Sequence, residues 1–196
     1  MWGQLIIFLT TVICLYLLIR ELSGKFKDVK IVTSLALFIW LLSQVVYTGE
    51  FNFYEDIYHD FNNIVTISLI LSAELMIVRV MRPALFRYPY FLVYTPFLIP
   101  VSFILIINTY MIKDLVFMIT QGIALFVYLL FMLDKSEIRL INIQSIIGVL
   151  LLIIAYITYW LLQNFIPIPA VLWQSLLAIG SLLLVHSLVN NLELKT

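Results

Sequence analysis

Seven long apolar runs alternate with short polar segments along this chain. The runs occupy residues 2–19, 31–47, 64–81, 91–108, 115–133, 143–162 and 170–189. Each run contains roughly 17–20 residues, and a helix of this length rises far enough, at about 1.5 Å per residue, to cross a hydrocarbon core of about 30 Å. The pattern therefore predicts an all-α integral membrane protein, a seven-transmembrane-helix bundle that forms a single domain over residues 1–196.

The positive charges are divided unevenly between the two faces of this predicted bundle. Of the 11 Lys and Arg residues, ten lie beside or between the runs on one face, and only Lys113 lies on the other. The positive-inside rule places a basic face in the cytoplasm. We therefore expect the N-terminus to lie outside and the C-terminus in the cytoplasm. Loops rich in isoleucine, asparagine and lysine suggest a bacterial inner membrane.

The composition restricts where any function can be located. The chain has 196 residues, of which 64% are hydrophobic and 11% charged. The seven runs leave no room for a soluble domain, so binding, catalysis or signalling is expected in the bundle or its short loops. Because the N-terminal segment lacks the basic region of a signal peptide, we expect the first run to remain a helix. The basic face suits anionic lipid headgroups, and no nucleic acid is expected as a partner.

Glu74 is the only acidic residue inside a run. An ionisable side chain within the bilayer costs roughly 2.5–3.5 kcal/mol on insertion scales, so it is expected to face protein or water. His186 is its predicted partner. Counted at the helical rise, the depths of Glu74 and His186 in the bilayer differ by only roughly 6–7 Å. Such a pair would relay a proton or respond to pH. The alternatives are that Glu74 bonds a hydroxyl or reaches Arg79 and Arg82, and that His186 bonds a backbone carbonyl or a lipid headgroup.

The segment 48–63 is acidic and contains no Lys or Arg. It is predicted to be an outer loop that carries Glu55, Asp56, His59 and Asp60 within six residues. On one helical turn the two aspartates would share a face with the histidine beside them, and this arrangement suits a divalent ion. The spacing matches no EF-hand or zinc motif. Interleaved aromatic residues favour the alternative of a solvated aromatic belt or a surface that docks another membrane protein.

Two runs carry aromatic and polar side chains at helical spacing. The second run has Thr33, Trp40, Gln44 and Tyr47, and the sixth has Ser145, Gly148, Tyr156, Tyr159 and Trp160. Helix packing through small and polar residues explains most of these positions. The alternative is a small aromatic-lined pocket that is open to the outside and binds a small molecule.

The fourth run contains Pro96 and Pro100. Each proline removes a backbone hydrogen bond that lipid cannot replace, so the kink must be covered by protein or open to a cavity. Tyr94, Thr95 and Ser102 are the candidate substitute partners. This part of the chain, Arg82-Pro-Ala-Leu-Phe through Phe97-Leu-Ile-Pro100, resembles seven-helix sensor regions of bacterial histidine kinases. The resemblance covers less than a fifth of the chain, and we assign no family from it.

A short motif occurs twice, which raises the question of an internal repeat. Trp40-Leu-Leu-Ser-Gln44 ends the second run, and Trp160-Leu-Leu-Gln-Asn164 ends the sixth, 120 residues later. If the runs are divided into three, a linker helix and three, the motifs occupy equivalent places, as in many transporters. The other runs show no such match, so a true repeat and a chance match both remain open.

The sequence contains no Gly-rich phosphate loop, no HExxH motif and no cluster of Cys and His. We therefore assign no catalytic residue and no cofactor, and an enzyme is not expected. The favoured hypothesis is a non-enzymatic sensor module, or an accessory subunit of a membrane complex, that acts through its acidic aromatic outer loop and its bundle. The alternative is a small-solute transporter of three-plus-one-plus-three design in which Glu74 couples transport to protons.

Overall fold

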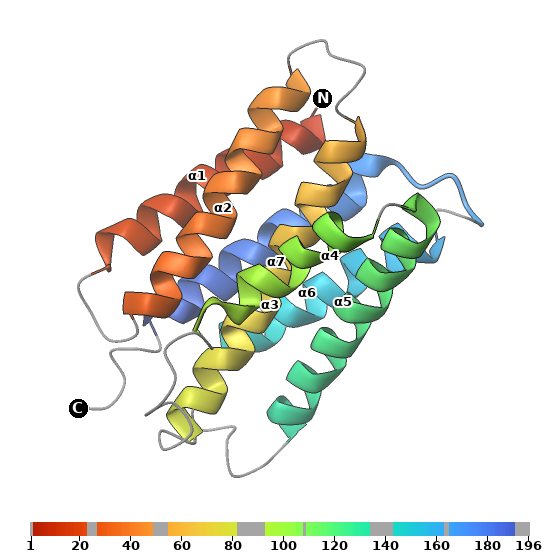
Figure 1. Ribbon diagram of the computed structural model, residues 1–196. Helices are drawn as coiled ribbons and strands as arrows, with labels where there is room; N and C mark the ends of the chain where they lie inside the picture. Colours follow the sequence, from red (N-terminus) through yellow and green to blue (C-terminus); the bar gives the residue numbers. More distant parts are fainter. Residues whose placement is uncertain are drawn as a thin grey trace.

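A computed structural model describes residues 2–22, 27–48, 55–81, 93–107, 109–133, 143–162 and 165–190. For residues 45–48, 55–58, 79–81 and 132–133 it describes the backbone alone. The helices are α1 (Trp2–Arg20), α2 (Lys27–Thr48), α3 (Glu55–Met81), α4 (Thr95–Ile106), α5 (Tyr110–Leu133), α6 (Ile143–Trp160) and α7 (Ala170–Asn190) (Figure 1). The prediction of an all-α fold with seven helices is confirmed for the part of the chain that the structure describes.

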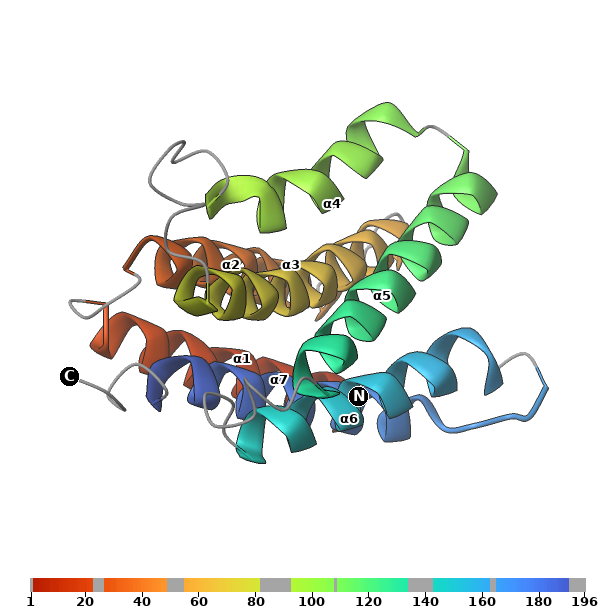
Figure 2. The same ribbon diagram turned by 90° about the horizontal axis from the view of Figure 1, so that it is seen from below.

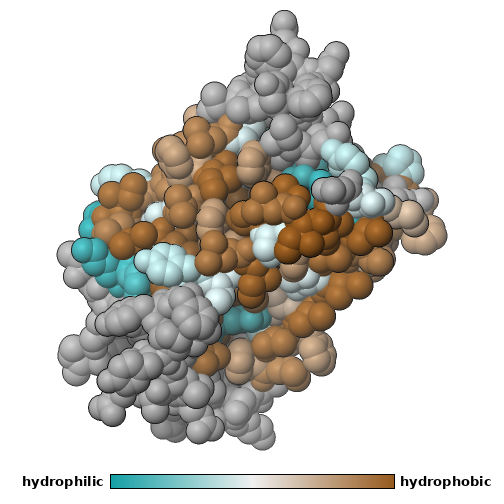
Figure 3. Space-filling view, in the orientation of Figure 1, coloured by the Kyte–Doolittle hydropathy of each residue, from teal (hydrophilic) through white to brown (hydrophobic). Residues whose placement is uncertain are grey.

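Five of these helices are long and apolar enough to cross a membrane: α1, α5, α6, α7, and α3 over His59–Val78. Large apolar side chains also cover the surface. Leu105 and Ile106 of α4 are each 76% exposed, Phe126 of α5 is 61% exposed, and the face that carries these helices is largely hydrophobic (Figure 3). Such an extended apolar surface suits contact with lipid. The chain is therefore a polytopic helical membrane protein.

Two of the predicted runs differ from the helices observed. α4 has 12 residues, whereas residues 91–108 were expected to be helical throughout; residues 91, 92 and 108 lie outside the described part of the chain. At the helical rise α4 spans only about 18 Å, less than a hydrocarbon core of about 30 Å. Pro96 lies in its first turn, where the missing N–H has no intrahelical partner to lose, whereas Pro100 lies inside the helix. α2 begins at Lys27 and takes charged residues into its first turn, and over its described residues it is not one of the five candidate spans.

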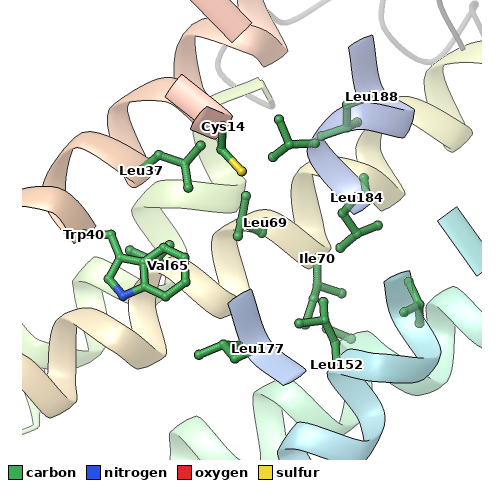
Figure 4. Close-up of a cluster of buried hydrophobic side chains, with 14 of the residues drawn as sticks. Cys14, Leu37, Trp40, Val65, Leu69, Ile70, Leu152, Leu177, Leu184 and Leu188 are labelled. Carbon is green, nitrogen blue, oxygen red and sulfur yellow. The ribbon is translucent and has the colours of Figure 1, made fainter. Parts of the chain in front are cut away.

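The helices are arranged in layers. Figure 2 shows α4 outermost, then α2 with α3, and then α1, α7 and α6, while α5 crosses beside α3. The main helix pairs are α6 with α7, α1 with α7, and α2 with α3. Side chains from α1, α2, α3, α6 and α7 meet in the interior, as Figure 4 shows for Cys14, Leu37, Leu69 and Leu184.

A close glycine contact joins α6 to α7. A Cβ atom added to Gly180 would lie 2.9 Å from the carbonyl oxygen of Gly148, and one added to Gly148 would lie 3.1 Å from the carbonyl oxygen of Gly180. The two backbones can approach this closely only because both residues lack a side chain. These two helices therefore form a tightly packed pair.

The helix ends define two ends of the bundle. The first residues of α3, α5 and α7 lie at the same end as the last residues of α2 and α6, and this end is called the Asp60 end. The opposite end, where α7 finishes, is called the His186 end. Among the described residues, Arg20, Lys27 and Lys30 lie at the His186 end, and Lys113 lies at the Asp60 end.

Candidate functional site

A pocket lies between α3, α5, α6 and α7, toward the Asp60 end. Its cavity volume is about 30 Å³, and its mouth is partly open. The described residues that line it are Asn62, Asn63, Thr66, Gln121, Leu125, Leu152, Ala155, Tyr156, Tyr159, Trp173 and Leu177. Ligand pockets commonly measure roughly 300–1,000 Å³, so in this structure the pocket has room for only a few water molecules, and a larger ligand requires the surrounding helices to move apart.

Side-chain amides form one wall of this pocket, and indole groups fix their orientation. The Trp40 Nε1–H group donates to Asn62 Oδ1 at 2.6 Å. The Trp160 Nε1–H group donates to Gln121 Oε1 at 2.8 Å, and Gln121 Nε2 in turn donates to Asn63 Oδ1 at 2.9 Å. Because an indole N–H can only donate, each indole requires an amide oxygen opposite it. The oxygen and nitrogen positions of these amides are thereby set.

Aromatic rings lie beside these amides. The ring centroids of Tyr159 and Trp173 lie 4.7 Å apart, and those of Tyr159 and Trp160 lie 4.9 Å apart. The Tyr156 hydroxyl donates to the Met118 carbonyl oxygen at 3.1 Å. Trp173 is 7% exposed, and its Nε1–H group has no hydrogen-bond partner among the described residues. The aromatic wall therefore contains a buried donor without an acceptor.

A charged cluster lies beside the pocket at the Asp60 end. Lys113 Nζ donates to Asp60 Oδ2 at 2.5 Å, and both side chains are 9% exposed. His59 Nδ1 lies 3.9 Å from Asp60 Oδ1 and 3.7 Å from Asp114 Oδ1. The His59 ring is 5.8 Å from the Tyr159 ring, so the cluster adjoins the aromatic wall. Lys113, the exception in the charge distribution along the chain, is thus compensated by a buried carboxylate.

This geometry corrects the expectation of a loop over residues 48–63. The chain is helical from Glu55, and Asp60 is buried and not solvated, because it accepts a hydrogen bond from Lys113 of α5. The side chains of Glu55 and Asp56 lie outside the described residues. Among the residues whose side chains are described, no group of three His, Cys, Asp or Glu residues is placed to hold a metal ion.

Glu74 and His186, which were expected to pair, each have other neighbours. His186 Nδ1 lies 2.7 Å from Gln144 Oε1, and Asn190 Nδ2 lies 3.1 Å from His186 Nε2. Glu74 Oε1 is buried and has no hydrogen-bond partner among the described residues. The Tyr128 hydroxyl is hydrogen-bonded to Ser145. The Glu–His relay therefore remains a prediction without a contact that supports it.

The remaining predicted residues fall into two groups. Tyr159 lines the pocket, and Trp40 and Trp160 orient its amides. Gln44 is 3% exposed, and its amide atoms have no partner among the described residues. Tyr94 precedes α4 at the His186 end, is 51% exposed, and does not line the pocket.

Sequence reasoning missed the polar residues that form the amide wall. Asn62 and Asn63 were placed in the expected loop, and Gln121 was not considered as a site residue. A usable signal was present, because Gln121 is a polar residue within an apolar run, where an amide needs a partner. Trp173 gave no comparable signal, since tryptophan is common near membrane interfaces.

No family model, curated protein or solved structure matches this chain, so its function must be argued from the site itself.

Proposed function

We propose that this chain is a membrane sensor module that binds a small molecule in the pocket between α3, α5, α6 and α7. The observation that carries the proposal is a small, partly open pocket in which oriented amides lie beside packed aromatic rings, and which a bound ligand would widen by moving the surrounding helices. Pockets with these features, mostly apolar with a few placed polar groups, are typical of small-molecule sites. The sequence contains no motif for chemistry on the bound molecule, which favours a receptor over an enzyme.

The orientation proposed for this sensor places the Asp60 end outside the cell. Among the described residues, Arg20, Lys27 and Lys30 lie at the His186 end, which the positive-inside rule assigns to the cytoplasm. The charge of Lys113 is offset by Asp60, so this lysine adds little net positive charge to the outer end. In this orientation the pocket receives its ligand from the extracytoplasmic side.

A ligand in the pocket would contact residues from four helices at once. A ligand shifts a conformational equilibrium only by the difference in its affinity for the two states. Because α6 and α7 are joined through Gly148 and Gly180, we expect them to move as one unit relative to α3 and α5. In this proposal a partner membrane protein detects that movement, and the first turn of α3, with Glu55 and Asp56, is the proposed docking surface.

A transporter is the second candidate, and one observation favours it. Glu74, Tyr128 and Ser145 lie seven or eight residues nearer the His186 end than the pocket residues Thr66, Gln121 and Leu152 on the same three helices. This separation is about 11 Å at the helical rise. Polar groups therefore continue beyond the pocket floor along α3, α5 and α6, as a path through the bundle would require. Glu74 is the proposed proton-coupling residue.

Native mass spectrometry of the chain in lipid nanodiscs tests the sensor proposal. We expect wild-type protein to retain a small molecule that Ala155→Trp, which fills the pocket, has lost. Ile154→Trp is the matched control, because Ile154 is exposed on the neighbouring position of α6 and should leave binding unchanged. Thr66→Ile provides a milder blocking variant if Ala155→Trp does not fold. Equal amounts of bound small molecule in the wild type and in both pocket variants would refute the proposal.

Uptake by proteoliposomes separates the two candidates. The molecule identified by mass spectrometry is offered outside vesicles with a proton gradient. A transporter accumulates it in the wild type and loses accumulation, but not binding, in Glu74→Gln. A sensor binds the molecule in both proteins and accumulates it in neither.

A further inference from the structure

The His59 ring, near the start of α3, lies between a hydrogen-bond donor and two acceptors. Asn63, one turn later on the same helix, places its Nδ2 atom 3.4 Å from both ring nitrogens. Asp60 Oδ1 lies 3.9 Å from the Nδ1 atom of the ring, and Asp114 Oδ1 lies 3.7 Å from it. The side chain is 26% exposed, so protons from water can reach it. The ring therefore has two sets of neighbours with opposite hydrogen-bonding character.

The orientation of the Asn63 amide is set by residues of α5 and α6. The Trp160 indole can only donate, and Gln121 Oε1 accepts from it at 2.8 Å. Gln121 therefore presents its Nε2 atom to Asn63 Oδ1, at 2.9 Å. The Nδ2 group of Asn63 is left toward His59, where it donates to the backbone carbonyl oxygen at 3.1 Å and faces the ring. The ring thus meets a donor that is linked to two other helices.

The charge of the ring decides which of its neighbours it suits. A neutral imidazole keeps one ring nitrogen as an acceptor in either tautomer, so the neutral ring suits the Asn63 donor. An imidazolium has two N–H donors and no acceptor, so it opposes Asn63 and is attracted to the carboxylates. The Oδ1 atoms of Asp60 and Asp114 are buried and have no hydrogen-bond partner among the described residues. Both atoms are therefore available to the charged ring.

The charges around the ring leave one carboxylate for His59 to compensate. The titratable side chains described near it are Asp60 of α3, Lys113 and Asp114 of α5, and Tyr159 of α6. Lys113 forms an ion pair with Asp60. Among the described side chains, Asp114 has its ion-pair contact with His59, and α2, α4 and α7 place no titratable group at this end. A protonated His59 therefore balances the second carboxylate.

We propose that His59 is a pH-sensitive switch: protonation turns its ring from Asn63 toward Asp60 and Asp114, and the change passes through the Asn63 amide to α5 and α6. Histidine is the side chain whose charge ordinarily changes between about pH 5 and about pH 8. A proton, like any ligand, shifts a conformational equilibrium by the difference in its affinity for the two states. The inference goes beyond the proposed function, since the proton itself is the signal and no small molecule is required in the pocket.

Nuclear magnetic resonance of the chain in lipid nanodiscs tests the switch between about pH 8 and about pH 5, with EDTA present to remove divalent ions. The chain has two histidines and four tryptophans, so the ring and indole signals are few. In a His186→Gln chain the ring nitrogen signals report the charge of His59 directly. We expect the Trp160 indole signal to shift on acidification with the same midpoint as the His59 ring. The signal of Trp2, which is 69% exposed, should stay in place.

Matched substitutions separate the switch from a general effect of pH. His59→Gln keeps a side chain that can form hydrogen bonds but does not titrate, so we expect the Trp160 shift to be lost. His186→Gln makes the same change at the other histidine and should retain the shift. Asp114→Asn removes the charge from one acceptor, and we expect it to make the shift smaller.

Three outcomes would overturn the proposal: a Trp160 shift that persists in His59→Gln, a Trp160 shift whose midpoint differs from that of the His59 ring, or no Trp160 shift in the wild type. If His59→Gln does not fold, the two midpoints in the His186→Gln chain decide the question. The sensor proposal is tested separately, because loss of a bound small molecule in Ala155→Trp does not depend on whether Trp160 responds to pH.

Discussion

The two Trp-Leu-Leu motifs make the same hydrogen bond in different surroundings. Trp40 of α2 donates to Asn62 of α3, and Trp160 of α6 donates to Gln121 of α5, at 2.6 and 2.8 Å. Trp40, however, is fully buried in the interior (Figure 4), whereas Trp160 is only partly buried and lies near the pocket. Both motifs orient an amide that lines the pocket, Asn62 and Gln121, and the two motifs differ in the exposure of the tryptophan itself.

The difference follows from how the neighbouring helices pack. α2 lies along α3 within one layer, so side chains fill the space around Trp40 (Figure 2). α5 crosses beside α3 and does not lie along α6, and the pocket opens in the space between these helices. Each motif thus supplies an oriented amide to the pocket wall, and the tryptophan is sealed in the first motif and partly exposed in the second. The prediction of a repeat gains no support from the bonding pattern, because Trp40 bonds the following helix and Trp160 the preceding one.

Truncation of the two tryptophans should show the largest contrast. Trp40→Ala removes a fully buried side chain, so we expect the free energy of unfolding to fall by about 3–5 kcal/mol. Trp160→Ala removes a partly exposed side chain beside open space, so we expect a smaller loss of about 1–2 kcal/mol. Unfolding of both variants in mild detergent, followed by circular dichroism, measures the difference. Equal losses of stability in the two variants would contradict the claim that Trp40 is sealed and Trp160 is partly exposed.

Removal of one charge from the ion pair beside the pocket should also be costly. Lys113→Met leaves Asp60 buried without its cation, and breaking a buried pair in this way typically costs about 3–5 kcal/mol. The control is the double variant Asp60→Leu/Lys113→Met, which removes both charges and should recover most of the lost stability. A double variant that is no more stable than Lys113→Met would show that the two charges do not depend on each other.

Alanine substitutions at Gly180 and Gly3 should differ in cost, because the first meets a backbone atom and the second meets a flexible side chain. A Cβ atom at Gly180 meets the backbone carbonyl of Gly148 at 2.9 Å, and that atom cannot move without shifting α6. We expect Gly180→Ala to cost about 1–3 kcal/mol. A Cβ atom at Gly3 meets chiefly the end of the Gln174 side chain, which can rotate away. Gly3→Ala should therefore cost less than Gly180→Ala, and the reverse order in thermal melting would contradict the proposed α6–α7 contact.

The number of helices could be predicted from the sequence because the length of an apolar run limits what can span a membrane. The extent of α4 could not be predicted, because its two prolines and its packing decide where the helix begins and ends. The site was predicted in part. Tyr159, Trp160 and Trp40 were recognised by their helical spacing, but the amide pair of Asn63 and Gln121 joins residues 58 positions apart in the chain.

Glu74 and His186 show that similar depth in the membrane does not by itself predict a contact between two side chains. The two residues were matched because they lie at similar depths in their runs. Contact also requires that the two helices turn these side chains toward each other, and helix rotation depends on packing with every neighbour. In the structure the nearest polar groups to His186 come from Gln144 and Asn190.

The central claim is that the space beside Thr66 opens to the outside while the space beside Trp40 is sealed. Reaction of single cysteines with a small membrane-impermeant thiol reagent in intact cells tests it directly, in a Cys14→Ser chain that has no other cysteine. Thr66→Cys lies in the pocket lining, and Ser43→Cys replaces a buried residue, 2% exposed, that bonds the Trp40 carbonyl. We predict rapid labelling of Thr66→Cys and labelling of Ser43→Cys only after unfolding. Equal labelling of the two, or labelling of Thr66→Cys only in inverted vesicles, would contradict the account.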